Sequence, residues 1–279
     1  MATNKNQHFV PRCYLRAFTL DSANSAINLF NIDRMKFVER APVKHQCSGD
    51  YFYGESLALE NALQATEGSH ATAVREILTP GFTLTDTHRD VLRRFWLLQH
   101  MRTEAASRRA VEMAAETRAL VGVEAPEFNL GIREAVLDAM RRFVDVMQAV
   151  DDLKVCLLRN LTKVPFVTSD DPAVLSSWWY LEDARTRTRS FGLHSAGALL
   201  LLPLSPEVLC LGYDDDVYSI SDGGGWAAVR HPKHVEALNE HQFLNCRANI
   251  FVRDSGHAGM VRDAYNRVTL LLCCFSGSC

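Results

Sequence analysis

Helical spacing of apolar residues extends, with short interruptions, from about residue 56 to residue 150, and it lies between two regions with strand patterns. Leu59, Leu63 and Ile77, for example, fall on one side of a helix. The spacing predicts helices over 56–78, 85–120 and 132–150, with a continuation of the last one to Arg159 left open. Consecutive helices of this length are typical of an antiparallel helical layer.

The flanking regions carry the patterns of strands. Apolar and polar residues alternate, or short apolar runs end at turn residues, over 26–32, 36–40, 164–167, 198–204, 208–213, 250–252 and 268–274. A further helix is predicted over 231–249. We therefore expect one α+β domain over 1–279, with an antiparallel helical layer packed against a mixed or antiparallel β-sheet. Residues 53–160 would form mainly the helical layer, and residues 1–52 and 163–274 mainly strands.

Composition excludes several classes of protein. The 279 residues are 47% hydrophobic and carry a formal net charge of −3, which argues against a broadly basic, nucleic-acid-coating surface. No apolar run reaches the roughly 18 residues of a membrane span, and the first residues lack the apolar core of a signal peptide. The eight cysteines form no C-x-x-C pair. We expect a cytoplasmic protein with no membrane partner.

An N-terminal segment, residues 7–18, combines apolar anchors with polar side chains that apolar packing does not require. The four apolar anchors are Phe9, Val10, Leu15 and Phe18. Between them lie His8, Arg12 and Tyr14, which are a titratable ring, a permanent cation and a phenol. The segment is therefore expected to dock on the domain. A plain strand and turn with satisfied polar groups is the alternative.

The first two predicted helices also carry polar faces. Glu60, Gln64 and Glu67 recur at i, i+4 and i+7, so they share one face of the first helix. That face is either a solvated stripe or, if it turns inward, a wall of carboxylates. On the second helix, Gln99 and Arg102 lie beside an apolar face. A buried Arg102 needs an acidic partner, and Glu60 or Glu67 is the expected one.

A third polar group follows the short apolar stretch 164–167, where Ser169, Asp170, Asp171 and Pro172 end a strand. A strand end combines a rigid backbone with exposed side chains, which suits a site. An Asx turn, formed for local reasons only, is the alternative. Arg109 is expected in solvent. The arginine-rich loop 182–190 is expected at the surface, with a phosphate contact left open.

These motifs, in their order and spacing, resemble a bacterial and fungal family of domains of unknown function, DUF4238, over about residues 7–254. The resemblance rests on Gln7-His8-Phe9-Val10-Pro11, Tyr14-Leu15, Phe18, Gln99, Arg102-Thr103, Thr168-Ser169-Asp170-Asp171-Pro172, Pro203-Leu204-Ser205-Pro206 and Asn239. It implies a single α+β domain and no established activity. The family pattern has Asn where this chain has Asp171, which adds a charge and leaves the role of that position open.

The sequence has no Gly-rich phosphate loop, no H-E-x-x-H and no G-x-S-x-G, so the common ATPase, zincin and lipase classes are not indicated. A mixed cluster of acids, a base and cations suits phosphodiester hydrolysis instead. We expect a metal-dependent, nuclease-like hydrolase acting in defence or as a toxin, with nucleic acid or a nucleotide as partner. A non-catalytic binding or sensor module for a small anionic ligand such as a nucleotide is the alternative, and a purely structural polar network is a third.

Each candidate residue has an expected role in the hydrolase hypothesis. The catalytic residues would be His8, Glu67 and Asp170. The ligands of Mg²⁺ or Mn²⁺ would be Glu60, Glu67 and Asp170. The substrate contacts would be Gln7, Arg12, Tyr14, Gln99, Arg102 and Ser169. The hypothesis requires these side chains to converge on one open pocket.

Overall fold

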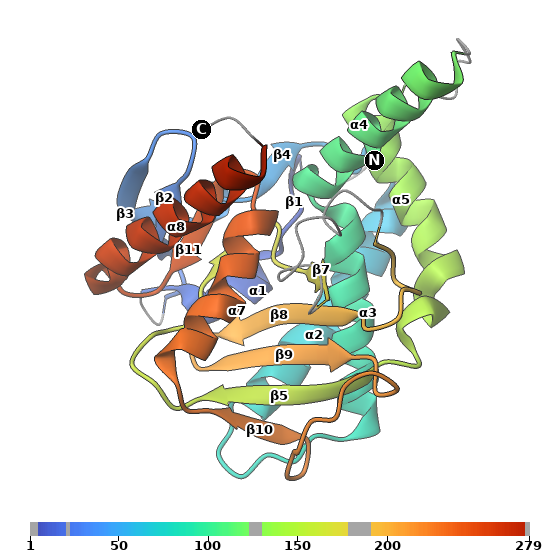
Figure 1. Cartoon of the computed structure of the whole chain (residues 1–279). Helices are drawn as coiled ribbons and strands as arrows, with labels where there is room; N and C mark the ends of the chain where they lie inside the picture. The colour runs from blue at the N-terminus through green and yellow to red at the C-terminus, as the bar shows by residue number, and fades with distance from the viewer. Residues whose placement is uncertain (1–4, 21–22, 123–129, 178–190, 277–279) are drawn as a thin grey trace.

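The computed structural model of the chain describes residues 5–20, 23–122, 130–177 and 191–276 (Figure 1). It is an α+β fold, as predicted. The helices are α1 (Arg12–Leu15), α2 (Leu57–Ile77), α3 (Asp86–Arg102), α4 (Glu104–Val121), α5 (Ile132–Val146), α7 (Pro232–Asn245) and α8 (Ala258–Ser276). The strands are β1 (Asn6–His8), β2 (Ala26–Asn31), β3 (Lys36–Pro42), β4 (Ser48–Asp50), β5 (Lys154–Asn160), β6 (Thr168–Ser169), β7 (Val174–Ser176), β8 (Leu199–Ser205), β9 (Val208–Tyr213), β10 (Trp226–Val229) and β11 (Asn249–Val252). The predicted loop 182–190 lies outside the described residues.

The strands form three sheets. A five-stranded sheet has the order β10-β5-β9-β8-β7 and is mixed, because β10 pairs parallel with β5 while the other neighbours are antiparallel. A four-stranded sheet, β3-β2-β11-β6, is antiparallel throughout. The small third sheet pairs β1 with β4. It brings the N-terminal segment beside the start of α2.

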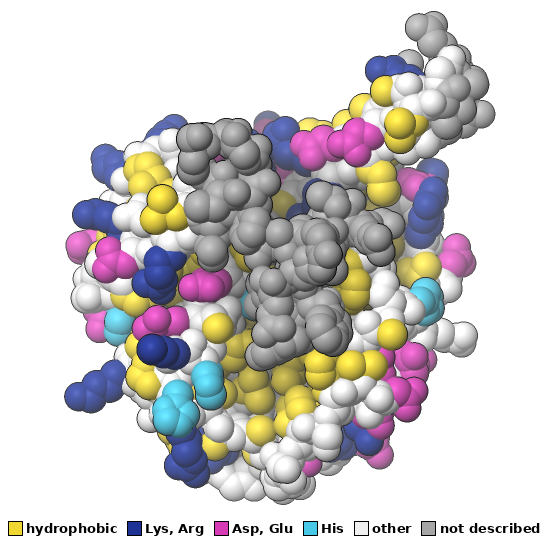
Figure 2. Space-filling model, in the orientation of Figure 1, with side chains coloured by type: hydrophobic (Ala, Val, Ile, Leu, Met, Phe, Trp, Pro, Cys, Tyr) yellow, Lys and Arg dark blue, Asp and Glu magenta, His cyan; other side chains and the backbone are white. Residues whose placement is uncertain are grey.

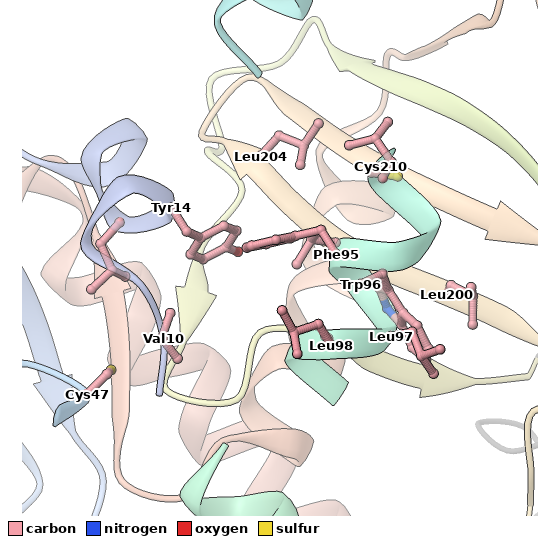
Figure 3. Packing of buried hydrophobic residues seen from close by; sticks show 14 of the residues in the cluster. Val10, Tyr14, Cys47, Phe95, Trp96, Leu97, Leu98, Leu200, Leu204 and Cys210 are labelled. Atoms are coloured by element: carbon pink, nitrogen blue, oxygen red, sulfur yellow. The ribbon is translucent and has the colours of Figure 1, made fainter. Parts of the chain in front are cut away.

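Helices α2 and α3 cover one face of the five-stranded sheet (Figure 1). Four consecutive residues of α3, Phe95 to Leu98, are at most 1% exposed, so this turn of the helix is surrounded by protein. Figure 3 shows Phe95 beside Tyr14 of the N-terminal segment, with Leu200 and Leu204 of β8 nearby. The main core therefore joins the helical layer, the sheet and the N-terminal segment.

The N-terminal segment is docked, as predicted. Its four apolar anchors, Phe9, Val10, Leu15 and Phe18, are all buried. The Tyr14 hydroxyl donates to Pro203 O at 2.7 Å and lies 2.7 Å from Thr168 Oγ1. It therefore contacts both the five-stranded and the four-stranded sheet. Within the described ranges, no helix is long and apolar enough to cross a membrane.

The long helix predicted over 85–120 is wrong, because the chain breaks at Thr103 into α3 and α4. Thr103 has an extended backbone (φ −72°, ψ 161°), and its hydroxyl caps α4 by accepting the N–H of Ala106 at 3.1 Å. The same hydroxyl donates to Asp171 Oδ1 at 2.6 Å. The contact between Thr103 and the distant Asp171 thus stabilises the break between α3 and α4. The local spacing of apolar residues does not indicate this break.

The continuation of the third helix to Arg159, which the sequence left open, does not occur, because β5 occupies 154–160 and pairs with β9 and β10. The helical block therefore ends before residue 160. The predicted terminal strand 268–274 is wrong, because these residues belong to α8. Its buried residues Val261, Ala264 and Val268 have helical spacing, whereas a short apolar run alone does not distinguish strand from helix.

Candidate functional site

A pocket of about 170 Å³ lies between the N-terminal segment and the first half of α2, and we call it the α2 pocket. The N-terminal segment contributes Gln7, His8, Pro11, Arg12 and Cys13, and the region from Tyr53 through α2 contributes Tyr53, Ser56, Glu60, Leu63, Gln64 and Glu67. The three residues spaced at i, i+4 and i+7 therefore face the pocket together. The structure lies between the two alternatives for this face: Glu60 and Glu67 are half-buried where α1 packs against α2, while Gln64 is exposed.

Arg102 lies beneath the pocket and ties its two sides together. Its side chain is fully buried, and Nη2 donates to Glu67 Oε1 and to His8 O, both at 2.8 Å. Its Nε donates to Phe9 O at 3.0 Å. The predicted ion pair between Arg102 and Glu67 is confirmed. The Glu67 carboxylate, in turn, is committed to this pair.

His8 is held as a neutral, oriented ring. Its Nδ1 lies 3.0 Å from Gln46 O, and because a carbonyl only accepts, Nδ1 carries the hydrogen and Nε2 is the basic nitrogen. Burial lowers the pKa of His8, and the nearby cations Arg12 and Arg102 lower it further, against the bond to Gln46. Near neutral pH the ring therefore offers a lone pair rather than a positive charge.

Glu60 and Arg12 give the pocket opposite charges. Glu60 Oε2 is buried and has no hydrogen-bond partner among the described residues. A buried carboxylate oxygen without a donor is costly, so a ligand that donates a hydrogen bond here would be stabilised. Arg12 also lines the pocket and is exposed, so it presents a permanent cation at the mouth.

Four of the other candidate residues have structural partners. Gln7 is buried, donating to Gly54 O at 2.9 Å and accepting from Tyr53 N at 2.7 Å, so it orients the edge of the pocket. Gln99 is fully buried against Phe9 O and Arg102 Nε. Ser169 Oγ donates to Gln242 Oε1 at 2.8 Å. With Tyr14, whose hydroxyl contacts Pro203 and Thr168, these residues lie in the interior rather than at an open surface.

Asp170 does not join the α2 pocket. It lines a separate pocket of about 140 Å³, where its carboxylate accepts the backbone N–H groups of Arg247, Ala248 and Asn249 at 2.8 to 2.9 Å. Burial raises the pKa of Asp170 to about 6, although the three N–H donors oppose this shift. The expectation that Asp170 and His8 share one pocket is not met.

The expected set of metal ligands, Glu60, Glu67 and Asp170, is accordingly not assembled. Asp170 belongs to the other pocket, and Glu67 is paired with Arg102. Across the described part of the chain, no three His, Cys, Asp or Glu side chains form a group that could hold a metal ion. The described side chains of the α2 pocket therefore do not fit a carboxylate-bound Mg²⁺ or Mn²⁺.

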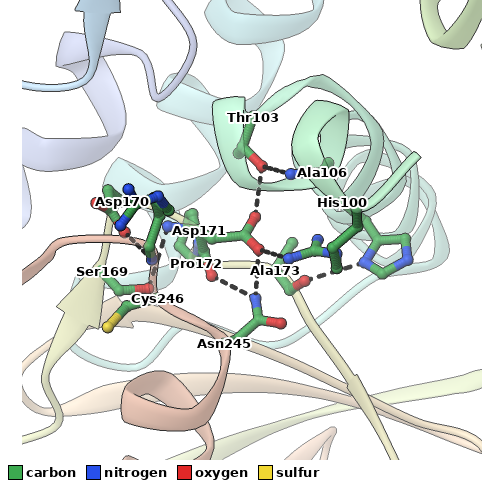
Figure 4. A network of polar contacts seen from close by, with 12 residues as sticks. His100, Thr103, Ala106, Ser169, Asp170, Asp171, Pro172, Ala173, Asn245 and Cys246 are labelled. Carbon is green, nitrogen blue, oxygen red and sulfur yellow. Dashed lines mark hydrogen bonds and ion pairs between the residues drawn. The ribbon is translucent and has the colours of Figure 1, made fainter. Parts of the chain in front are cut away.

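A second polar cluster surrounds Asp171, which is fully buried (Figure 4). Its carboxylate accepts from Thr103 Oγ1 and Arg109 Nη1, both at 2.6 Å, and from Asn245 Nδ2 at 2.9 Å. Arg109 is solvated, as predicted, with a side chain that is 45% exposed, but it also forms an ion pair with Asp171. The charge added at Asp171 is compensated by Arg109. No local pattern signals this pairing, because the two residues are 62 positions apart.

Comparison with known families agrees with the motifs. A family model described as protein of unknown function, DUF4238, matches residues 6–256. The chain belongs to this family. The matched range of DUF4238 includes both the α2 pocket and the Asp171 cluster. No curated protein and no solved structure matches the chain significantly.

Proposed function

We propose that the α2 pocket binds a small ligand with a hydrogen-bond donor at one end and an anionic group at the other, such as a nucleotide. The observation that carries this proposal is the buried Glu60 Oε2, which has no hydrogen-bond partner in the described part of the chain and lies in the same pocket as the exposed cation Arg12. A cavity of about 150 Å³ holds a benzene-sized molecule, so a pocket of about 170 Å³ accepts one ring. A nucleobase could donate its amine to Glu60 while the phosphate lies at Arg12.

Direct titration tests this proposal. Nucleoside monophosphates and the matching nucleosides would be titrated calorimetrically into the wild type, Arg12→Ala and Glu60→Gln. Loss of a charged hydrogen bond predicts about 10- to 100-fold weaker nucleotide binding in each variant. Arg12→Ala should weaken nucleotides but not nucleosides, because only the former carry phosphate.

Arg16→Ala is the control, because Arg16 is an exposed arginine in the same segment that does not line the pocket. The proposal fails if nucleotides bind the wild type no more tightly than nucleosides. It also fails if Arg16→Ala and Arg12→Ala weaken binding equally, since that result would indicate a general charge effect.

A second candidate function, phosphodiester hydrolysis, is supported by the orientation of His8. A neutral imidazole with Nδ1 bonded to a carbonyl and Nε2 basic has the form of a general base, and Arg12 could stabilise phosphoryl charge. His8→Ala should lower turnover of labelled RNA, DNA or cyclic nucleotides by about 10²- to 10⁴-fold without unfolding the protein. A role in defence or as a toxin stays a prediction.

The exposed His45→Ala variant is the control for His8→Ala. Since the described carboxylates do not form a metal site, we expect any turnover to persist with chelator. If a chelator abolished the turnover, the result would instead support a metal-dependent hydrolase. Absence of turnover together with tight nucleotide binding would leave the binding function alone.

A further inference from the structure

A third pocket, of about 640 Å³, is lined by residues of α7 and of the five-stranded sheet. In Figure 1, α7 lies on the face of this sheet opposite to α2 and α3. We call this pocket the α7 pocket. Among the described residues, it shares no lining residue with the α2 pocket. Its floor is formed by leucines from three neighbouring strands, Leu158, Leu199, Leu201 and Leu211. Figure 2 shows hydrophobic side chains gathered over this part of the sheet.

The polar lining of the α7 pocket comes from two histidines of α7 and from Ser177, Tyr218 and Ser219. His234 and His241, two turns apart on α7, both line it. His241 is 6% exposed, and burial lowers its pKa to about 4, so it is neutral near pH 7. His234 is exposed in the first turn of the helix, next to the exposed Lys233. Figure 2 shows histidine, lysine and arginine side chains beside the hydrophobic area, where Figure 1 draws the start of α7.

Charge at this end of α7 favours an anion. Lys233 and Arg230 are exposed beside His234, and the N-cap residue of α7, His231, makes no side-chain capping bond. The acidic residues of α7, Glu236 and Glu240, lie 3.6 and 3.5 Å from Arg267 of α8, which compensates one of their two charges. The end of the pocket near His234 is therefore basic.

We propose that the α7 pocket binds a long-chain monocarboxylate, with its alkyl chain against the leucines of the sheet and its carboxylate at His234. The site is independent of the function proposed for the α2 pocket. Ligand pockets commonly have volumes of about 300 to 1,000 Å³, and this one is within that range. A sugar or nucleotide would place its own polar groups against the leucines without hydrogen-bond partners. An alkyl chain has no polar groups to leave unpaired.

Dodecanoate and dodecanol, titrated against the full chain, test the proposal by comparing a charged with an uncharged head group. We expect dodecanoate to bind about tenfold or more tightly than dodecanol, as for loss of one charged hydrogen bond. His234→Ala should reduce this preference to near unity. Ala237→Trp, at an exposed position that lines the pocket, should weaken both ligands by at least about tenfold by filling it.

Ala119→Trp is the matched control, because Ala119 is exposed on α4 and away from the pocket. Circular dichroism would verify that each variant is folded. The proposal is overturned if dodecanoate does not bind up to its solubility limit, if dodecanol binds equally well, or if Ala237→Trp leaves binding unchanged. It is also overturned if sedimentation shows a dimer that Ala237→Trp abolishes, because a second copy would then cover the pocket.

Discussion

Arg102 is a fully buried guanidinium whose partners come from two distant parts of the chain. Glu67 belongs to α2, while the carbonyl groups of His8 and Phe9 belong to the N-terminal segment. Arg102 itself ends α3. One side chain therefore holds three parts of the chain together around the α2 pocket. Among the described residues, Glu67 is the one acid within 4.0 Å that compensates its charge.

Replacing Arg102 with methionine should lower the free energy of unfolding by about 3 to 5 kcal/mol, because Glu67 would lose its partner and the carbonyl groups of His8 and Phe9 would each lose one donor. Urea unfolding of the wild type and the variant measures this change. Arg108→Met is the control, because Arg108 forms a partly exposed pair with Glu104 on α4. That variant should stay within about 0.5 kcal/mol of the wild type. Equal losses in both variants would contradict the central role of Arg102.

At the residue scale, the sequence predicts pairs that a simple physical need enforces. A buried arginine requires an acid, and Glu67 was one of two candidates on the adjacent polar face. The sequence does not predict that Asp170 accepts hydrogen bonds from the backbone at 247–249. Every residue except proline has a backbone N–H group, so the sequence does not indicate which of them Asp170 contacts. For the same reason, the sequence could not predict that Asp170 lies outside the α2 pocket, and only the structure shows it.

At the scale of elements, Thr103 determines where one helix ends and the next begins. Its hydroxyl both caps α4 and donates to the buried Asp171, so the break between α3 and α4 is tied to the turn after β6. Local spacing across this break is helical on both sides, which explains why a single helix was predicted. The strands β2, β8 and β9, in contrast, were predictable because their patterns are short and bounded by turns.

Thr103→Ala should destabilise the protein more than the loss of a cap alone. An N-cap substitution costs about 0.5 to 2 kcal/mol, and leaving one buried carboxylate oxygen with fewer donors adds about 1 to 3 kcal/mol. Thr85→Ala is the matched control, because Thr85 caps α3 through His88 N at an exposed site. Chemical unfolding should show the larger loss for Thr103→Ala, and equal losses would contradict a tie to Asp171.

At the scale of the whole molecule, the interior contains several histidines that are held neutral. Burial lowers the pKa of His70 to about 3 and that of His241 to about 4, and it also lowers the pKa values of His8 and His100. They belong to different elements, α2, α7, β1 and α3. Acid therefore acts on the entire fold at once rather than on one site.

We predict that the free energy of unfolding falls as the pH is lowered from about 6.5, the unfolded pKa of histidine, toward 4. The unfolded chain binds protons that the folded histidines do not, so stability is complete above this range and is lost below it. Asp170, with its pKa raised to about 6, acts in the opposite direction but is a single group. Urea unfolding at pH 7.5 and pH 5 measures the difference.

His70→Leu is the control for this effect. His70 is stacked on Phe95, and neither ring nitrogen has a partner among the described residues, so an apolar side chain should be tolerated at neutral pH. The variant should lose less stability than the wild type between pH 7.5 and pH 5. An unchanged difference would mean that His70 does not contribute to acid sensitivity.

The docked N-terminal segment has a consequence for the order of events during synthesis. The hydroxyl of Tyr14 contacts Thr168 and Pro203, which are 154 and 189 positions later in the chain. At translation rates of about 5 to 20 residues per second, the segment is synthesised roughly 10 to 40 s before Pro203. During that interval Phe9, Val10, Leu15 and Phe18 have no completed core to enter. The N-terminal segment of the nascent chain should therefore bind chaperones that recognise exposed hydrophobic segments, and release them only after β8 has been synthesised.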